Sequence, residues 1–153
     1  KNLKYDYVFF PCQIQKCHWV LYVVQKTKEG PKILYYDSAN NSVPEHTELT
    51  RDNPTKVLRN FVHTASYINE EDMKQNKKVN PELRQDLLAQ YQPVAQPFNQ
   101  KQSNGNDCGF YVMLVAKYLA QNRLSDVPKI TPENILKLRE QCLFEIINEI
   151  HLK

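Results

Sequence analysis

The sequence predicts an α+β fold in which helices flank a central β-sheet. Segments rich in β-branched and aromatic residues fill much of the first 36 positions, and helix start signals and long apolar runs occupy most of the rest. A length of 153 residues suits one hydrophobic core, so we expect residues 1–153 to form a single domain. The hydrophobic fraction of 41% and the charged fraction of 24% are ordinary for a globular protein.

Three strands are expected in the N-terminal part of the chain. Residues 7–10 read Tyr-Val-Phe-Phe and predict a buried strand, which we expect Pro11 to end. Residues 19–24 and residues 33–36 are β-branched and aromatic, and they predict the second and third strands. Residues 26–32, which include Gly30-Pro31, are expected to form the turn between these two strands.

The middle of the chain is predicted to be helical. Asn53-Pro54 and Asn80-Pro81 each place a capping residue before a proline at the first helical position. We expect the two helices to run to about residue 66 and about residue 91. The polar segment 69–80 carries no motif that assigns it a role, and a short strand is expected over residues 94–98.

Two more helices are predicted in the C-terminal part. The apolar run that begins at Cys108 continues to residue 122, and its length favours a buried helix over a strand. Thr131-Pro132 begins a last amphipathic helix. Its apolar positions at near-helical spacing are Ile135, Leu138, Cys142, Ile146 and Ile150.

Charge and hydropathy argue against two classes of partner. The net charge of +3 arises from basic and acidic residues that are mixed along the chain, whereas nucleic-acid-binding proteins usually gather basic residues on one face. No apolar run reaches the roughly 18 residues that a membrane span needs. Residues 1–6 do not lead into the apolar stretch of a signal peptide. We therefore expect neither nucleic acid nor a membrane as a partner.

The four cysteines, Cys12, Cys17, Cys108 and Cys142, do not have the spacing of a small disulfide framework. We therefore expect free thiols and a reducing compartment, the cytoplasm or nucleus. If the protein is a secreted effector, this compartment would be that of a host cell. Cys12, Cys17 and His18 could approach one zinc ion, but no second ligand pair has zinc-like spacing, so we expect no metal site. Cys142 has the position of a buried core residue, as Cys12 and Cys17 do to a lesser degree.

The second and third predicted strands bring a histidine and a carboxylate together. A hairpin centred on Thr27-Lys28 places His18 opposite Asp37 at one end of the sheet. Directly opposed residues of antiparallel strands have Cβ atoms about 5 Å apart, which lets Asp37 accept a hydrogen bond from the ring. A carboxylate so placed fixes the tautomer of a histidine and stabilises its charged form. On position alone, a strand-edge histidine and a turn aspartate remain the alternative interpretation.

Cys108 is the candidate nucleophile. It begins a predicted helix, and the N–H groups and partial positive charge of a helix N-terminus favour the reactive thiolate. Only three glycines occur, and two of them, Gly105 and Gly109, bracket Cys108, so we expect them where the backbone needs freedom or close approach. Gln102 offers an amide that can donate to a developing oxyanion, as can the Cys108 N–H.

The segment Gln102–Gly109 reads Gln-Ser-Asn-Gly-Asn-Asp-Cys-Gly and resembles the Q-x-N-x-x-D-C-G signature of the ubiquitin-like-protein-specific cysteine proteases. His18-Trp19 at a strand start, and Tyr35-Tyr36-Asp37-Ser38 at the end of the next strand, resemble the other two motifs of that family in the same order. The family removes SUMO, NEDD8 or ubiquitin, and its clan includes the adenovirus protease and bacterial effectors. The resemblance covers roughly residues 8–122.

The resemblance implies a papain-like cysteine protease fold with a central mixed β-sheet and the chain order His, Asp, Cys. It implies Cys108 as nucleophile, His18 as base and then acid, Asp37 as the orienting group and Gln102 as oxyanion donor. It further implies that the substrate-binding residues are Trp19, Asn104, Gly105 and Gly109, with Trp19 covering a tunnel for a Gly-Gly tail; a core aromatic is the alternative. No cofactor is implied.

The resemblance also implies the reaction and the partner. The expected activity is a thiol isopeptidase or peptidase that cleaves after the C-terminal Gly-Gly of ubiquitin, NEDD8 or SUMO and releases the modifier from lysine. Residues 36–42 favour ubiquitin or NEDD8 slightly over SUMO. Seventeen residues precede His18, fewer than is usual in the family, so we expect N-terminal family elements to be missing from this chain.

Three other functions remain open at this point. A clan-related acetyltransferase has a similar Cys/His site but usually carries Glu where Asp37 stands. A viral-type processing protease would use the same chemistry on peptide bonds. A non-catalytic module would bind a modifier, although all four chemical positions here hold competent residues.

Overall fold

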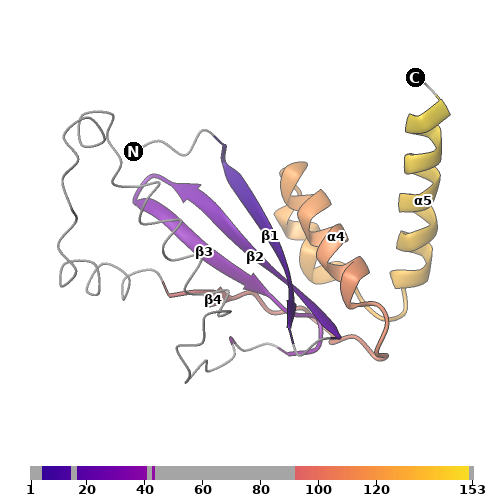
Figure 1. Cartoon of the computed structure of the whole chain (residues 1–153), viewed down its shortest axis with the longest axis horizontal. Helices are drawn as coiled ribbons and strands as arrows, with labels where there is room; N and C mark the ends of the chain where they lie inside the picture. The colour runs from indigo at the N-terminus through magenta and orange to yellow at the C-terminus, as the bar shows by residue number, and fades with distance from the viewer. Residues whose placement is uncertain (1–4, 15–16, 41–42, 44–91, 152–153) are drawn as a thin grey trace.

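The computed structural model describes residues 5–14, 17–40, 43 and 92–151 of the chain, with side chains described as far as residue 148 (Figure 1). The predicted helices that begin at Asn53 and Asn80, and the polar segment 69–80, lie outside the described residues.

Four strands form one sheet in the order β1-β2-β3-β4. The strands are β1 (Tyr7–Ile14), β2 (His18–Thr27), β3 (Gly30–Tyr36) and β4 (Val94–Ala95). The pairs β1–β2 and β2–β3 are antiparallel, and β3–β4 is parallel, so the sheet is mixed. With the helices that follow, this confirms the predicted α+β architecture.

Three helical elements follow the sheet in the chain: α4 (Cys108–Ala120), the short 3₁₀ helix η1 (Leu124–Lys129) and α5 (Ile135–His151). Helix α4 packs against β2 and β1, and α5 lies on the far side of α4 from the sheet (Figure 1). The predicted helix from Cys108 is confirmed, and it ends at Ala120 rather than residue 122. Asn122 adopts φ +56°, a left-handed conformation that ends helices.

The expectation that Pro11 ends the first strand was wrong. β1 continues through Pro11 to Ile14, and Pro11 pairs with Leu21 of β2. β1 is at the edge of the described sheet, where proline's lack of an N–H need not cost a ladder hydrogen bond. The second and third strands are likewise longer than predicted, and the expected strand over 94–98 contains only the two residues of β4.

The predicted hairpin register was wrong by two residues. Thr27 pairs with Gly30 and Leu21 with Tyr36, so the two-residue loop is Lys28-Glu29. Gly30 has φ +128°, a conformation that other residues rarely adopt, and this places the turn one residue later than expected. Because side chains alternate with a period of two, a two-residue shift keeps His18 and Asp37 on one face, now as diagonal neighbours.

The sheet separates two apolar clusters. On one face, alternate residues of β2 and β3 such as Leu21 and Leu34 pack with Tyr111, Leu114 and other residues of α4. On the opposite face, the cluster consists of Val20, Tyr22, Val24, Ile33 and Tyr35. Burial on both faces explains why the second strand is an unbroken apolar run rather than an alternating one.

Helix α5 is buried only along part of its predicted apolar face. Ile135 and Cys142 are buried, but Ile146 is 49% exposed. The helix itself begins at Ile135, after a turn over residues 132–134, rather than at Thr131-Pro132.

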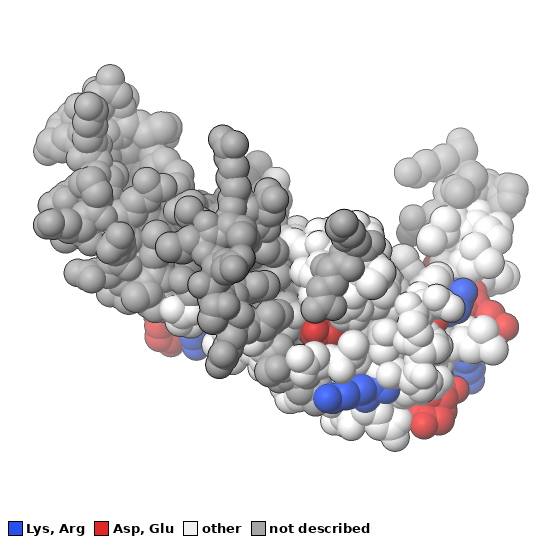
Figure 2. Space-filling view, turned by 60° about the horizontal axis from the view of Figure 1, so that its bottom comes forward, with Lys and Arg blue, Asp and Glu red and all other residues white. Residues whose placement is uncertain are grey.

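Several charged side chains of the described residues form ion pairs. Figure 2 shows basic and acidic side chains interspersed on one face rather than gathered by sign. Lys117 bonds Glu145 at 2.5 Å, and Asp126 bonds both Arg123 and Lys129 at 2.7 Å. None of the described helices is long and apolar enough to cross a membrane.

Candidate active site

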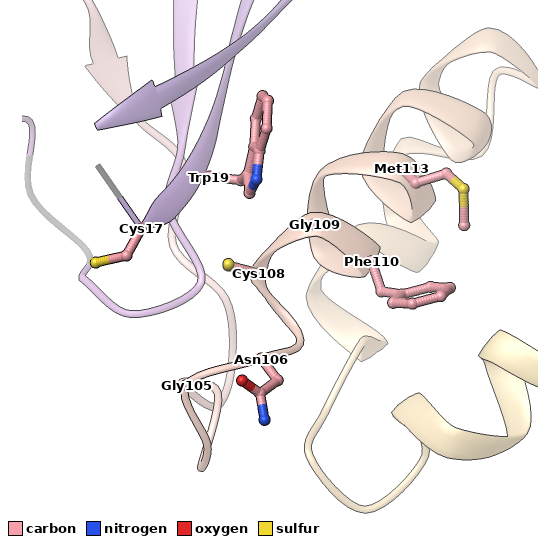
Figure 3. A pocket seen from close by; sticks show the side chains of 8 residues that line it. All are labelled: Cys17, Trp19, Gly105, Asn106, Cys108, Gly109, Phe110 and Met113. Atoms are coloured by element: carbon pink, nitrogen blue, oxygen red, sulfur yellow. The ribbon is translucent and has the colours of Figure 1, made fainter. Parts of the chain in front are cut away.

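A pocket of about 440 Å³ opens at the N-terminal end of α4 (Figure 3). Residues from the end of the β1–β2 connection, the start of β2, the loop before α4 and the first turns of α4 line it. They are Cys17, Trp19, Gly105, Asn106, Cys108, Gly109, Phe110 and Met113. Cys108 therefore faces a cavity that a substrate can enter, between the strand that carries Trp19 and the helix that carries Met113.

Cys108 is the first residue of α4 and is only 4% exposed. The first-turn N–H groups of a helix have no acceptor within the helix, and the dipole adds partial positive charge at this end. Asp107 occupies the N-cap position, but its side chain makes no capping hydrogen bond. Among the described residues, no acceptor bonds the N–H groups of Cys108 and Gly109, so these groups are available to a thiolate or an oxyanion.

His18 and Asp37 are in direct contact. Nε2 of His18 lies 2.7 Å from Oδ1 of Asp37, so the hydrogen bond expected from the sequence is present despite the shifted register. An ionised carboxylate can only accept, so Nε2 carries the proton and Nδ1 is the basic nitrogen of the neutral ring. This assigns the proton-accepting role of the ring to a defined atom.

Asp37 is buried and held by several donors. Its Oδ1 accepts from the backbone N–H groups of Ala39 at 2.8 Å and Asn40 at 3.1 Å, and its Oδ2 accepts from the Tyr35 hydroxyl at 3.0 Å. Burial, and then the negative charge of Asp37, raises the pKa of Tyr35 well above its ordinary value of 10, so Tyr35 remains a neutral donor. These bonds fix the carboxylate that orients His18.

Gln102 is tied to the segment that carries Asp37. The Ser38 hydroxyl donates to Oε1 of Gln102 at 2.5 Å, and the Gln102 backbone N–H donates to the Ser38 carbonyl at 2.8 Å. Nε2 of Gln102 donates to the Asn104 carbonyl at 2.7 Å. An amide NH₂ has two hydrogens, so one remains for an oxyanion. Ser38 thus couples the Asp37 turn to the loop that precedes Cys108.

Asn104 shapes this loop. Its Oδ1 accepts from the N–H groups of Asn106 at 2.9 Å and Asp107 at 3.1 Å, and its Nδ2 donates to Oδ2 of Asp107 at 2.8 Å. Such local bonds from an asparagine side chain favour a turn over continued helix or strand. The geometry gives Asn104, which was predicted to bind substrate, a role in holding the loop.

The structure brings the predicted residues together in three groups rather than one. Trp19, Gly105 and Gly109 share the pocket with Cys108; His18 bonds Asp37; and Gln102 bonds Ser38 and Asn104. Among the described residues, no hydrogen bond joins the Cys108 thiol to His18. Catalytic hydrogen bonds in free enzymes are often long and shorten only when substrate binds.

Two expectations about individual residues require correction. Cys17 is exposed and lines the pocket, whereas the sequence favoured a core position. Neither Gly105 nor Gly109 has a positive φ, and nothing lies within 4 Å of a side chain added at Gly105. At Gly109 an added Cβ would lie 4.0 Å from Cδ1 of Trp19, an ordinary contact. The described chain itself therefore does not require glycine at these two positions.

Trp19 is 40% exposed and contributes to the pocket wall, so it is not a core aromatic. Figure 3 shows its indole ring standing between β2 and the start of α4. Four other contributors were not singled out from the sequence: Tyr35, Ser38, Asp107 and Arg139. The first three lie inside or next to the motifs, but Arg139 lies 31 residues beyond Cys108, where spacing gave no signal.

The described cysteines, Cys12, Cys17, Cys108 and Cys142, are all free. Burial raises the pKa of the Cys12 thiol, which disfavours its thiolate. No cluster of metal-ligating side chains is present among the described residues.

Comparisons with known proteins place the chain beside one protease family. The model of the Ulp1 protease family, C-terminal catalytic domain, matches residues 1–153. No curated protein matches the chain. A solved structure of the C-terminal Ulp1 protease domain in complex with Smt3, the yeast ortholog of SUMO, is 18% identical, with a TM-score of 0.49. The match covers 89% of this chain and 49% of that one.

Two further solved structures are of the SUMO protease Ulp1 with an oxidised catalytic cysteine. The form with a sulfonic acid is 18% identical and covers 82% of this chain and 49% of that one. The form with a sulfinic acid is 19% identical, and the match covers 82% of this chain and 48% of that one. Both have a TM-score of 0.47. The chain thus spans about half the length of the solved structures that it matches.

Proposed function

The chain belongs to the Ulp1 protease family, and from this premise we propose that it is a cysteine protease that cleaves after the C-terminal Gly-Gly of a ubiquitin-like modifier. The observation that supports this most directly is Cys108, which begins α4 and lines an open pocket beside Trp19. The His18–Asp37 pair and Gln102 supply the remaining chemistry that thiol hydrolysis needs.

In the first half of the reaction, the Cys108 thiolate attacks the carbonyl carbon of the terminal glycine. The carbonyl oxygen becomes an oxyanion, and the donors available to it are the Cys108 N–H and the second hydrogen of Gln102 Nε2. His18, protonated on Nδ1 by the thiol, gives that proton to the leaving lysine amine as the C–N bond breaks. The product is a thioester between Cys108 and the modifier.

In the second half, water attacks the thioester. His18 Nδ1 accepts a proton from the water, and Cys108 leaves as the thiolate when the C–S bond breaks. Asp37 stabilises the charged ring in both halves through the bond at 2.7 Å. Apart from the substrate and the attacking water, every group in this scheme belongs to the chain, so the scheme requires no cofactor.

The small residues beside Cys108 support a glycine tail as the substrate segment. Gly105, Gly109 and Cys108 contribute little side-chain bulk, and Trp19 forms a wall next to them. A diglycine segment has no side chains and is the class of peptide that lies most closely against these small residues and the Trp19 ring. We propose SUMO, NEDD8 or ubiquitin and their conjugates as partners, and the cytoplasm or nucleus, where free thiols persist, as the location.

The test is a panel of SUMO, NEDD8 and ubiquitin probes that end in a propargyl group, incubated with the wild-type chain and with Cys108→Ala. We expect the wild type to form a covalent adduct with at least one probe, and C108A to form none while it still binds that modifier. A wild-type chain that reacts with none of the three probes, or a C108A variant with full turnover, would contradict the proposal.

The same panel separates the alternatives. A non-catalytic binding module would retain the modifier without an adduct, and a clan-related acetyltransferase would transfer an acetyl group from its cofactor without cleaving a modifier conjugate. Cys142→Ala is the matched control, because Cys142 is buried against α4 and makes no contribution to the pocket at Cys108. It should react with the probe as the wild type does.

A further inference from the structure

Arg139 of helix α5 contacts the residues on both sides of Cys108. Nη1 of Arg139 lies 3.0 Å from Oδ1 of Asp107, which directly precedes Cys108. The guanidinium carbon of Arg139 lies 4.4 Å from the centre of the Phe110 ring, two residues after Cys108. One side chain from α5 thus holds the first turn of α4 at two points.

The Asp107 carboxylate is buried next to the nucleophile. Its side chain is 6% exposed, whereas that of Arg139 is 41% exposed. A buried carboxylate without a positive partner is costly, and negative charge close to a thiol opposes formation of the thiolate. Arg139 supplies the positive charge that offsets this effect.

The orientation of Asp107 is unusual for its position. Aspartate at an N-cap normally accepts a hydrogen bond from an N–H of the first helical turn. In this chain the two carboxylate oxygens are instead bonded to Asn104 and Arg139, and no capping bond forms. The N–H groups at the start of α4 are the ones that a Cys108 thiolate or an oxyanion needs.

We propose that Arg139 is a positioning residue that draws the Asp107 carboxylate away from the first-turn N–H groups of α4 and neutralises it. The proposal rests on the proposed function only in taking Cys108 as the nucleophile. Without Arg139, the carboxylate can rotate to cap the helix, where it competes for those N–H groups and places uncompensated negative charge beside the thiol.

The test measures the alkylation rate of Cys108 by iodoacetamide as a function of pH, with peptide mass spectrometry to separate Cys108 from exposed Cys17. For R139M we expect the rate near neutral pH to fall about tenfold, because the uncompensated Asp107 carboxylate disfavours the thiolate that iodoacetamide alkylates. On a cleavable modifier substrate, kcat should fall and KM should change little, since no substrate contact is removed.

A second substitution distinguishes this role from simple structural support. Alanine at position 107 can neither cap α4 nor carry charge, so D107A/R139M should recover most of the alkylation rate that R139M loses. R139K keeps the charge but lacks the planar stack on Phe110, and its rate should lie between those of the wild type and R139M.

Arg123 provides a matched control. It also combines an ion pair, to Asp126 at 2.7 Å, with a stack on an aromatic ring, that of Tyr118 at 4.7 Å. It lies beyond the far end of α4, a helix of 13 residues and so roughly 20 Å long. R123M should alter the alkylation rate of Cys108 by less than about twofold.

Three outcomes would overturn the proposal: R139M alkylated at the wild-type rate, D107A/R139M as slow as R139M, or R123M as slow as R139M. If R139M does not fold, D107A alone decides, because it should react at least as fast as the wild type, and a slower reaction refutes the proposal. Alkylation requires no modifier, so this result is independent of whether the proposed substrate is correct.

Discussion

Replacing Asp37 with asparagine tests the charge at the centre of the site. Oδ1 of Asp37 accepts from His18 Nε2 at 2.7 Å and from two backbone N–H groups, and Oδ2 accepts from Tyr35. In D37N the oxygen of the amide can retain the three bonds to Oδ1, while the nitrogen takes the position next to Tyr35. The substitution therefore removes charge and preserves most of the geometry.

The magnitude follows from the kind of bond that is weakened. A hydrogen bond to a charged group contributes about 1.5–3 kcal/mol, and a neutral one about 0.5–1.5 kcal/mol. Loss of the charge thus removes roughly 1–2 kcal/mol of stabilisation from the protonated ring of His18, plus its longer-range attraction to Asp37. We expect kcat to fall about 10- to 100-fold in D37N, with little change in KM.

The assay is steady-state cleavage of a modifier with a fluorogenic C-terminal group, with thermal unfolding as the check on folding. Tyr35→Phe is the matched control, because it removes one bond to Asp37 and leaves the charge; its kcat should fall by less than about tenfold. If folded D37N lost less than about twofold in kcat, or lost no more than Y35F, the assigned role of Asp37 would be wrong.

Three further substitutions test the surrounding structure. Tyr36 is buried, its hydroxyl has no partner among the described residues, and burial is the main reason that its pKa is raised to about 12. Between about pH 10 and 12 the folded chain therefore keeps a proton on Tyr36 that the unfolded chain loses, so stability falls as pH rises through this window. Y36F should lessen this fall. Because it removes a hydroxyl that has no partner among the described residues, Y36F should be as stable as the wild type or more stable by up to about 1 kcal/mol in denaturant titrations. Gly109→Ala should fold normally, because the added Cβ would lie 4.0 Å from Trp19, an ordinary contact. We expect kcat/KM for cleavage to fall, because the diglycine tail would occupy the same space. A G109A variant with the wild-type kcat/KM would show that the tail does not use this space. Ser38→Ala removes the donor to Gln102 Oε1. In steady-state kinetics we expect kcat to fall about 2- to 10-fold while the variant still binds the modifier probe. An unchanged kcat would mean that the Gln102 amide does not need the bond from Ser38.

The sequence predicted the sheet and α4 well because their signals are local. Runs of β-branched and aromatic residues marked β2 and β3, and the long apolar run after Cys108 marked α4. The behaviour of Pro11 could not be predicted in this way, since it depends on β1 being an edge strand of the described sheet. Strand order is a property of the whole sheet and is not encoded in a short segment.

The contact between His18 and Asp37 was predicted from a register that was wrong, and it is present because the error was an even number of residues. An error of one residue would have placed the two side chains on opposite faces. The Lys28-Glu29 loop was misplaced because the sequence alone did not show that Gly30 adopts a positive φ.

The contact of Arg139 with Asp107 could not be predicted from the sequence. This contact depends on how α5 packs beside α4, and nothing in the spacing of the two residues indicates it. By contrast, Ser38 and Asp107 adjoin predicted site residues, so attention to the residue next to each motif position could have found them.

The central claim is that Cys108 is the nucleophile toward a modifier with a diglycine tail. The most direct measurement is peptide mass spectrometry of the adduct formed with a reactive propargyl probe of SUMO, NEDD8 or ubiquitin. Cys17 lines the same pocket and is exposed, so it is the internal competitor. We expect the probe on Cys108 alone, in equal amount in Cys17→Ser; an adduct on Cys17, or one that persists in C108A, would contradict the assignment.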